Sequence, residues 1–559
     1  MKATSKQLCT FYFTPRIPND DGSSKNSEWE CNKCGKTKMK SGGWTNLLNH
    51  ARSCVGVSFQ TDYEALHAKT TKPNSIASFV LRINDTERDM YKWVEWVVML
   101  NQPLSIVDNP LTREGMRYKP VTSKLLRKNI LALGKEVRAS IKKKLPNKFS
   151  IVFDGWSEGT VHYIGVSAAY VMLIDSQEVV VHTLLSMRPL LADDINGMKA
   201  SDHINHLLKM LSSYGKTDTN IVCLVGDNCS VNQSMSKILK VPLIGCGSHK
   251  FNLAIRKWIS NQPGLEDIIQ KVALVMKKAS TLKVSAQLRK LTSLHTVKAN
   301  DTRWSSTFEM CARFFRIQSE LSAVDDLIPL IPSLYEVDTL CKGFKHLSIF
   351  NDLTIMLQKE GITFLRVREI FDTILEDYPE LSGHLGPASS IIVDVAFEMA
   401  VTKIAKGQVL SEEERECVKR LLRQEDEFEA GNSFNDEADE GGHELSYLQK
   451  FEARIKKRKL NDDDIASQYI NLGVLAGTSV SCERLFSAAK HILTDTRKCT
   501  SPAVFEAILL LKVNRSEWDV HSMGRAMGQT IGTRLTANAD ADIIIDSDTD
   551  EDPDLFYAG

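Results

Sequence analysis

The chain has 559 residues, which is too long for a single hydrophobic core and predicts two to four domains. Hydrophobic residues make up 43% and charged residues 25%, and the 70 acidic and 70 basic residues leave no formal net charge, so any binding of nucleic acid must use local basic patches. No apolar run approaches the roughly 20 residues that span a bilayer, and residues 1–10 lack the apolar core of a signal peptide. The twelve cysteines are scattered, so we expect a reducing compartment, cytosol or nucleus, and no membrane partner.

Four potential metal ligands near the N-terminus have the spacing of a zinc site. Cys31 and Cys34 form a C-x2-C pair, and after fifteen intervening residues His50 and Cys54 follow, one helical turn apart. Zn²⁺ prefers a tetrahedron of four nitrogen and sulfur ligands, which this Cys3His set supplies. The alternative is two unrelated thiols and a surface histidine, but the four ligand types and both short spacings favour zinc. Zinc should supply much of the folding free energy of so small a module.

This module, residues 8–58, resembles a BED-type zinc finger, whose aromatic residue before the first cysteine pair is matched by Trp29. The resemblance implies a DNA-binding module. Leu47 and Leu48 are expected to pack its helix against the cysteine turn. Five basic side chains suit phosphate contacts, although a run of charge is more often a solvated face: Lys33, Lys36, Lys38, Lys40 and Arg52.

Residues 60–145 show the periodicity of a small helical bundle. Residues 87–100 carry apolar side chains at helical spacing, residues 101–110 form a loop, and residues 125–144 form a second, basic helix. We expect a helical region whose Lys and Arg side chains can face DNA, with a role in DNA binding or dimerisation.

Two buried strands then each end on an aspartate. Asp154 follows the apolar run 149–153, and Asp227 follows the run 221–225. Further strands are predicted at 161–174, 178–186 and 241–246, with a helix at 201–212 and a short helix from 231. The order β-β-β-α-β-α-β is the topology of an RNase H-like fold, a mixed sheet with strands 1–3 antiparallel and strands 1 and 4 adjacent. Asp154 and Asp227 are therefore expected to lie close together, although a lone aspartate at a strand end more often caps a turn.

Adjacent carboxylates repel each other and favour a cation between them. Hard oxygen ligands suit Mg²⁺ or Mn²⁺, and a pair of such ions activates water and stabilises the leaving oxygen in phosphoryl transfer. A site of this kind normally needs a third acid.

Residues 481–487, which read SCERLFS, resemble the signature of the hAT superfamily of DNA transposases. In that family the glutamate of this motif is the third catalytic acid, so the resemblance implies this role for Glu483, beside Asp154 and Asp227. Residues 103–109 are similar to a segment upstream of the catalytic core in the same family. Two further motifs match, and the resemblance implies that they support the active site or contact DNA: Cys246 and His249 in C-x2-H, and Arg303 and Trp304 in R-W.

Each match has a plainer explanation when it is taken alone. Glu483 would be favoured in the first turn of any helix opened by Ser481, because the helix dipole attracts a carboxylate there. Trp304 would more often belong to a core, and Arg303 to a surface ion pair. No second ligand pair accompanies Cys246 and His249, so we predict a structural or DNA-contact element there and no zinc. Five motifs in the family's order favour the functional interpretation: FDGW around Asp154, GDN around Asp227, C-x2-H, R-W and SCERLFS.

The resemblance also divides the rest of the chain. It implies a first part of the core at 146–305, an all-helical insertion at 306–455, and a second part of the core with the dimerisation region at 456–520. Helices are predicted at 327–340, 344–357, 364–375 and 412–422. Residues 424–444 and the tail at 521–559 are acidic and are predicted to be disordered. The basic run 454–459 suits nuclear import, phosphate binding or a solvated helix face.

The helix at 503–513 is strongly apolar, which fits either subunit contact or an intrachain core. The residues assigned to dimerisation are Phe505, Ile508, Leu509 and Leu511.

The resemblance therefore implies a nuclear hAT-type transposase, with structural Zn²⁺ and two catalytic Mg²⁺ or Mn²⁺ ions. Its partners would be double-stranded DNA, at element ends and target, and further copies of the chain as a homodimer or larger homo-oligomer. The alternative is a domesticated, non-catalytic DNA-binding and dimerising protein on the same scaffold.

Overall fold

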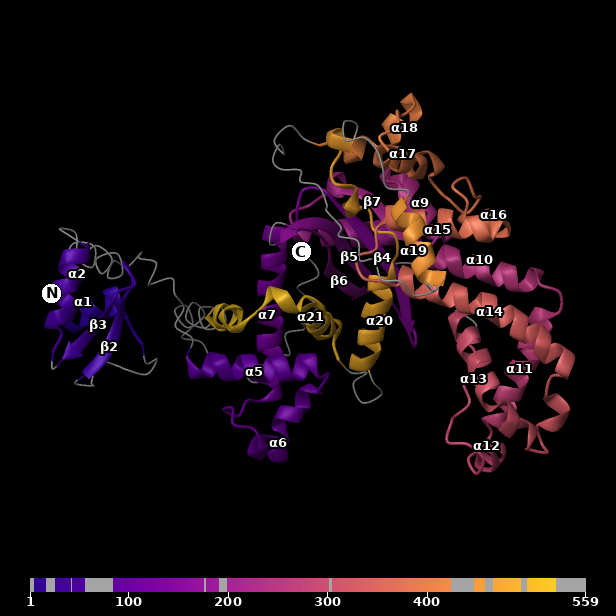
Figure 1. The fold of residues 1–559 in the computed structure, drawn as a ribbon, viewed down its shortest axis with the longest axis horizontal. Helices are drawn as coiled ribbons and strands as arrows, with labels where there is room; N and C mark the ends of the chain where they lie inside the picture. The colour runs from indigo at the N-terminus through magenta and orange to yellow at the C-terminus, as the bar shows by residue number, and fades with distance from the viewer. Residues whose placement is uncertain are drawn as a thin grey trace, which may run out of the picture. The chain divides into compact units, whose positions relative to one another are not determined.

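The computed structural model describes residues 5–16, 26–41, 43–55, 84–174, 177–190, 199–300, 304–423, 447–457, 466–493 and 500–528. The chain divides into two compact units, Met1–Arg88 and Asp89–Gly559 (Figure 1). No helix within these ranges combines the length and the apolar character needed to cross a membrane.

The first unit is a three-stranded antiparallel sheet flanked by two helices. Its sheet has the order β1-β2-β3. A core of seven buried residues includes Phe13, Trp29 and Leu47, which join the sheet to the second helix. Its elements are α1 (Ser5–Tyr12), β1 (Phe13–Pro15), β2 (Asn26–Cys31), β3 (Thr37–Ser41) and α2 (Thr45–Val55).

Between residues 84 and 145 the structure has three helices and a 3-10 turn. Two of the helices correspond to those predicted at 87–100 and 125–144, whereas the short helix α6 and the 3-10 turn, which lies in the predicted loop, were not predicted. Asn109 caps α6 by accepting a hydrogen bond from the Leu111 N–H at 2.9 Å, and Thr122 caps α7 through the Leu125 N–H at 3.2 Å. These elements are α5 (Asp85–Met99), η1 (Leu104–Asp108), α6 (Pro110–Gly115) and α7 (Ser123–Lys144). One stripe of α7 lies in the core of the second unit: Leu126, Ile130, Leu133, Val137 and Ile141.

A five-stranded mixed sheet organises the second unit. Its order is β6-β5-β4-β7-β8, with β4, β5 and β6 antiparallel and β4, β7 and β8 parallel. The predicted antiparallel strands 1–3 and the pairing of strands 1 and 4 are therefore present. The strands are β4 (Phe149–Glu158), β5 (Val161–Ile174), β6 (Gln177–Pro189), β7 (Ile221–Gly226) and β8 (Leu243–Gly245).

The first strand is longer than predicted. Asp154 was expected at its exit, but β4 continues to Glu158 because it pairs with β5 as far as the Glu158–Val161 pair. The prediction followed the apolar run, which ends where the strand leaves the core, whereas hydrogen bonding to β5 continues beyond it.

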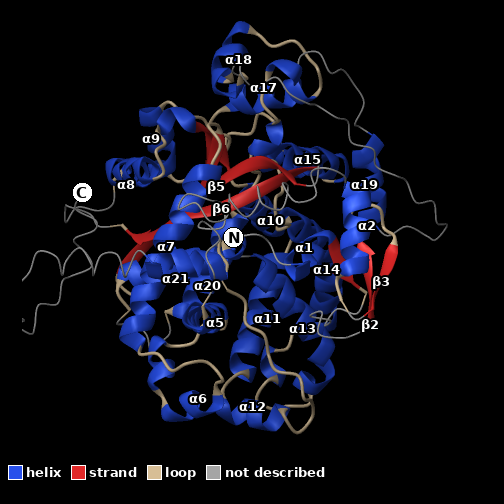
Figure 2. Cartoon of the chain, turned by 90° about the vertical axis from the view of Figure 1, so that its left-hand side faces the viewer, coloured by secondary structure: helices blue, strands red, loops and turns tan. Residues whose placement is uncertain are grey.

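Helices lie on both sides of these strands (Figure 2). Ile151 of β4 packs into the cluster that contains α7 and α21, whereas Val152 faces the opposite cluster with α17 and residues 474–476. The strand is therefore buried on both faces, as its continuous apolar run indicates. The helices that follow the sheet's first strands are α8 (Ala200–Ser213), α9 (Ser230–Leu239), α10 (Gly247–Asn261), α17 (Val395–Ala405), α18 (Glu412–Cys417), α20 (Val480–Ile492) and α21 (Pro502–Val513).

A second, separate core is formed by helices and the turns between them, and it extends away from the sheet (Figure 1). The two helices predicted at 327–340 and 344–357 are one helix, which starts at Leu334. Ser333 caps it through the Glu336 N–H at 3.3 Å, and Pro332 precedes this cap. The remaining helices are α11 (Leu265–Ala279), α12 (Leu282–Leu288), α13 (Trp304–Ser322), α14 (Leu334–Leu357), α15 (Phe364–Asp377), α16 (Ser382–Leu385) and α19 (Tyr447–Lys457).

Several predictions concern residues outside the described ranges. These are the acidic stretch 424–444, most of the tail, and Arg303. Residues 520–528 are helical, with Met523 and Ala526 buried, so ordered structure extends past the tail's predicted start at 521. In the basic run, Arg454 binds Asp377 at 2.6 Å, so this side chain belongs to an ion pair within the chain.

The α21 residues assigned to dimerisation lie in the core of the chain: Phe505, Ile508, Leu509 and Leu511. Intrachain packing accounts for their apolar character, and a role in joining subunits stays a prediction. The same helix carries Glu506, which is 1% exposed and binds Arg138 at 2.7 Å and Arg188 at 2.8 Å.

Candidate functional site

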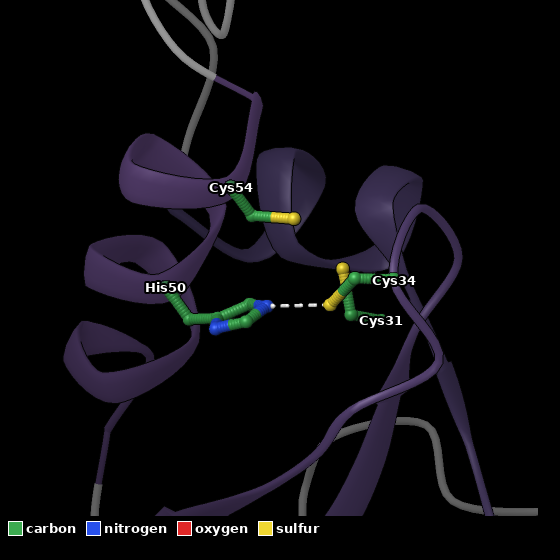
Figure 3. A group of neighbouring side chains, drawn as sticks. All are labelled: Cys31, Cys34, His50 and Cys54. Carbon is green, nitrogen blue, oxygen red and sulfur yellow. Dashed lines mark hydrogen bonds between the residues drawn. The ribbon is translucent and has the colours of Figure 1, made fainter.

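The four predicted zinc ligands converge in the first unit (Figure 3). Cys31 ends β2, Cys34 lies in the turn that follows, and His50 and Cys54 lie one turn apart on α2. Their ligand atoms all lie within 4.8 Å of one another, and Cys34 Sγ is 3.3 Å from His50 Nε2. This group has the ligand types and the closeness that a tetrahedral Zn²⁺ site requires.

The local fold explains why these side chains meet. The Gly35 N–H donates to the Cys31 carbonyl at 2.8 Å, and Gly35 has a φ of 70°, so the chain turns back between the two cysteines. On the helix, the fully buried Leu47 anchors α2 against the sheet. The Phe13 ring lies 5.8 Å from the His50 ring and limits where the imidazole can point.

The surroundings of the group shift the pKa values of its ligands in different directions. A hydrogen bond from the Lys36 backbone lowers the pKa of Cys34, whereas desolvation raises the pKa of Cys54 to about 11. Desolvation and the nearby Lys38 and Lys36 lower the pKa of His50, which keeps its imidazole neutral. A divalent ion needs neutral histidine and thiolate, and it would itself drive Cys54 to deprotonate.

One of the five basic residues predicted to face solvent, Lys40, is buried instead. Lys40 is 5% exposed, and its ammonium group lies 4.9 Å from the centre of the Trp44 ring. The cation–π contact and burial of the stem explain the difference. Lys33, Lys36 and Arg52 are exposed and Lys38 is half-buried.

The three predicted catalytic acids line a single cavity in the second unit. Asp154, Asp227 and Glu483 come from β4, the end of β7 and the first turn of α20. The cavity has a volume of about 740 Å³, and all three side chains are partly exposed. Segments far apart in the sequence therefore bring three carboxylates to the same opening.

The sheet brings the two aspartates to the same level. Val152 of β4 pairs with Val225 of the parallel β7, so each aspartate lies two residues beyond this pair. Asp154 Oδ1 accepts from the Gly155 N–H at 2.8 Å. Asp227 Oδ1 accepts from Asn232 Nδ2 at 2.6 Å. The register of adjacent parallel strands thus places one carboxylate beside the other.

Helix α20 approaches the sheet closely and carries Glu483. A Cβ at Gly165 of β5 would lie 2.8 Å from Leu485 Cδ2, so glycine permits this approach. The fully buried Cys482 has its Sγ 3.7 Å from the carbonyl oxygens of both Val152 and Gly165. Burial raises the pKa of the Cys482 thiol well above its usual value, and the negative charges of Asp154 and Glu483 raise it further.

Cys246 fixes the start of the same helix. Its buried Sγ accepts from the N–H of Ser479, the N-cap residue of α20, at 3.3 Å. The next N–H, of Gly247, donates to the Gly477 carbonyl at 2.9 Å. The predicted capping by Ser481 is absent: α20 begins at Val480, and Ser481 Oγ has no hydrogen-bond partner among the described residues. These contacts give Cys246 a structural role at the start of α20, and the alternative of a DNA contact stays a prediction.

Cys246 and two further predicted residues, His249 and Trp304, also line the cavity. His249 is exposed on α10, and Trp304 is 3% exposed at the start of α13. The Trp304 N–H donates to Asn252 Oδ1 at 3.0 Å. Trp304 is thus a core residue that also lines the cavity. Arg303 lies outside the described residues.

The cavity also contains residues that the sequence reasoning missed. Trp156 and Phe486 stack with ring centroids 6.1 Å apart and an interplanar angle of 16°. Ser487 and Lys490 line the same wall. Helical spacing could have found this wall, because positions 483, 486, 487 and 490 share one face of a helix. The cavity thus combines acids, an aromatic pair and a cation.

The acids do not form a close ligand group of the kind seen in the first unit. Across the described ranges, only Cys31, Cys34, His50 and Cys54 bring at least three metal-binding side chains together in this way. The three carboxylates share an opening, and an ion bound there would have to draw them closer.

Comparisons with known proteins do not identify a family. No protein-family model matches the chain, and no curated protein matches it. The mixed α/β fold and the Cys3His group are therefore the firmest features from which to reason about function.

Proposed function

We propose that this chain is a hAT-type DNA transposase with an N-terminal BED-type zinc finger and an RNase H-like catalytic core. It would cleave and transfer DNA strands at transposon ends, using Asp154, Asp227 and Glu483. The all-helical segment between Trp304 and Glu483 would be an insertion in this core. The chain would act in the nucleus as a homodimer or larger homo-oligomer.

One observation carries the proposal: three acids that are widely separated in the sequence line the same cavity. The strand order β6-β5-β4-β7-β8, with the first three strands in sequence antiparallel, is the order expected of an RNase H-like sheet. The Cys3His group supports a zinc-bearing module with exposed basic side chains. These features are independent of one another, and all three fit a metal-dependent enzyme acting on DNA.

The cavity's own residues fit such chemistry. Carboxylates are the donors that Mg²⁺ and Mn²⁺ prefer, and Asp154, Asp227 and Glu483 would hold two such ions. When bound, these ions supply activation of water or a DNA hydroxyl and stabilisation of the leaving oxygen. His249 and Lys490 line the same opening, where both would donate hydrogen bonds to phosphate oxygens.

A second candidate is a non-catalytic DNA-binding and dimerising protein on the same scaffold. The observation that favours it is the absence, among the described residues, of a close ligand group made by the three acids. In that case the zinc finger would be the functional DNA-binding module, and the cavity would be what is left of a catalytic site that is no longer active.

A nicking assay separates the two candidates. Purified chain is incubated with a supercoiled plasmid that carries the genomic flanks of its coding region, in Mg²⁺ or Mn²⁺. We expect nicking that depends on the ion and falls by a factor of about 10² or more in Asp154→Asn. The matched control is Asp325→Asn, an exposed aspartate outside the cavity, which should nick as the unchanged chain does.

Nicking that persists in Asp154→Asn would contradict the proposed mechanism. Absence of nicking in the unchanged chain, combined with zinc-dependent binding to the same DNA, would favour the non-catalytic candidate.

A further inference from the structure

Helix α7 carries a concentration of positive charge in a chain with no net charge. Of its 22 residues, eight are Lys or Arg and one is acidic. Arg138 and Lys144 bind Glu506 and Glu517 within the fold. The other six basic residues are all exposed: Lys124, Arg127, Lys128, Lys135, Lys142 and Lys143. Two of them also have a partner within the chain, because Arg127 donates to Ser501 Oγ at 3.0 Å and Lys135 makes an intramolecular contact.

Four of these lysines form a line along the helix. At about 100° per residue, Lys124, Lys128, Lys135 and Lys142 lie within about 40° of one another around the helix axis. They extend over eighteen residues, or about 27 Å at 1.5 Å per residue. The opposite stripe of α7 is buried in the core, so packing fixes the line of lysines toward solvent. We call this line the α7 lysine face.

The stability of the helix does not explain this arrangement. The N-terminal end of a helix carries partial positive charge and favours acidic residues. The first turn of α7 contains no acidic residue, and Lys124, Arg127 and Lys128 lie near this end. Only Lys142 and its neighbours are where the dipole favours cations. The helix dipole therefore does not account for the lysines near the start of α7, whereas an external partner of negative charge would.

The fold restricts which partner can bind. A basic helix that binds membranes inserts its apolar face, but the apolar stripe of α7 is already buried against α21. A long, straight line of lysines matches a long, regular array of negative charge. Duplex DNA offers this array, with one phosphate charge per about 1.7 Å of its axis. Helix α7 also packs on α21, which contacts the α20 that carries Glu483, so the face belongs to the body that holds the cavity.

We propose that the α7 lysine face binds the phosphate backbone of duplex DNA without reading its base sequence. This inference rests on the proposed function, in which the same body acts on DNA, and it adds a contact surface apart from the zinc finger and the cavity. Four lysines contacting phosphates would release counterions, so this contact should be strongly salt-dependent.

The test measures how DNA affinity depends on salt. Full-length chain, with zinc bound, is titrated onto a fluorescent 30-base-pair duplex of arbitrary sequence between 50 and 200 mM KCl. In the quadruple variant K124Q/K128Q/K135Q/K142Q, the slope of log affinity against log salt should become shallower by about 3 to 4, because each phosphate contact contributes about 0.9. The conservative variant K124R/K128R/K135R/K142R should keep the original slope.

A matched control has the same change in net charge. The variant K237Q/K290Q/K345Q/K406Q removes four exposed lysines on other elements and should alter the slope little. An equal change of slope in this control, or no change in the α7 variant, would overturn the proposal. The proposal would also be overturned if the α7 variant lost binding to polyglutamate but bound DNA as the unchanged chain does. The partner of the α7 lysine face would then be an acidic polypeptide.

The salt-dependence test of the lysine face and the nicking test of the transposase activity can give negative results independently of each other. If the unchanged chain does not nick DNA but the α7 variant loses salt dependence, the lysine face stands and the transposase activity does not. If nicking at saturating DNA persists while the slope is unchanged, the activity stands and the lysine face does not.

Discussion

At the scale of single residues, the positions of the carboxylates that line the cavity depend on neighbouring side chains that hold the backbone in place. Cys246 is such a neighbour, because its thiol accepts a hydrogen bond from the residue that caps α20. Its residue type alone would suit a metal ligand, although the sequence predicts no zinc there, and its side chain is 3% exposed and in contact with backbone. Its physical role is to hold the start of the helix that presents Glu483.

We expect Cys246→Ala to lower the free energy of unfolding by about 1–2 kcal/mol, through the lost packing and the unpaired Ser479 N–H. Ion-dependent nicking should fall more than stability alone explains, because Glu483 loses its fixed position. Cys246→Ser keeps an acceptor and should retain more activity. Denaturant unfolding and nicking by both variants check this, and equal activity in the two would contradict the anchoring role.

The residue scale also shows how far sequence reasoning reaches. Asp154, Asp227 and Glu483 were found from strand-end patterns and one motif, and all line the cavity. Trp156 and Phe486 were missed because each belongs to a motif already assigned to the adjacent acid. Their stacking depends on how α20 lies across the sheet, which periodicity along the sequence does not contain.

At the scale of elements, apolar runs predicted where strands and helices lie better than where they end. Strand β5 has the predicted bounds, because both of its ends coincide with changes of polarity. Strand β4 continues past its apolar run, since the hairpin partner supplies hydrogen bonds there. For helix α21 the bounds were predicted well, but its apolar residues fitted either subunit contact or an intrachain core. Only the tertiary structure shows that they lie in a core of the same chain.

Helix α21 also carries a buried charge that ties three elements together. Glu506 binds Arg138 of α7 and Arg188 of β6, and Ser186 Oγ donates to it at 2.9 Å. Burial alone would raise the pKa of Glu506, but the two arginines hold it below its usual value. The ion pairs therefore keep the carboxylate charged inside the core.

We expect Glu506→Gln to lower the free energy of unfolding by about 3–5 kcal/mol, because two arginines lose their buried partner. The folded pKa lies below the unfolded value of about 4.3, so the stability from this group is fully present above that pH. It is lost as pH falls through the lower, folded pKa. The difference between unchanged chain and variant should thus be constant from pH 7 to 5 and shrink in stronger acid. A difference that grows on acidification would contradict this assignment.

At the scale of the whole molecule, the two units differ in what holds them together. The first unit has a core of seven buried residues, whereas the second has three clusters that together contain far more. Such a small core cannot offset the conformational entropy of its chain without further support. The sequence predicted this dependence on zinc from module size and ligand spacing, and the convergence of Cys31, Cys34, His50 and Cys54 agrees with it.

Removal of zinc should therefore unfold the first unit alone. We expect one zinc ion per chain, and chelation should change the fluorescence of the packed pair Trp29 and Trp44 while leaving the main thermal transition in place. Cys31→Ser should lose the metal, whereas Cys341→Ser, at an exposed cysteine of α14, should keep it. Because binding free energy is folding free energy in such modules, acid that protonates the ligands should act as the chelator does.

Two outcomes would contradict this prediction. If a chelator lowered the main thermal transition by several degrees, the metal would also support the second unit. If the zinc content of Cys31→Ser were unchanged, the proposed ligand set would be excluded.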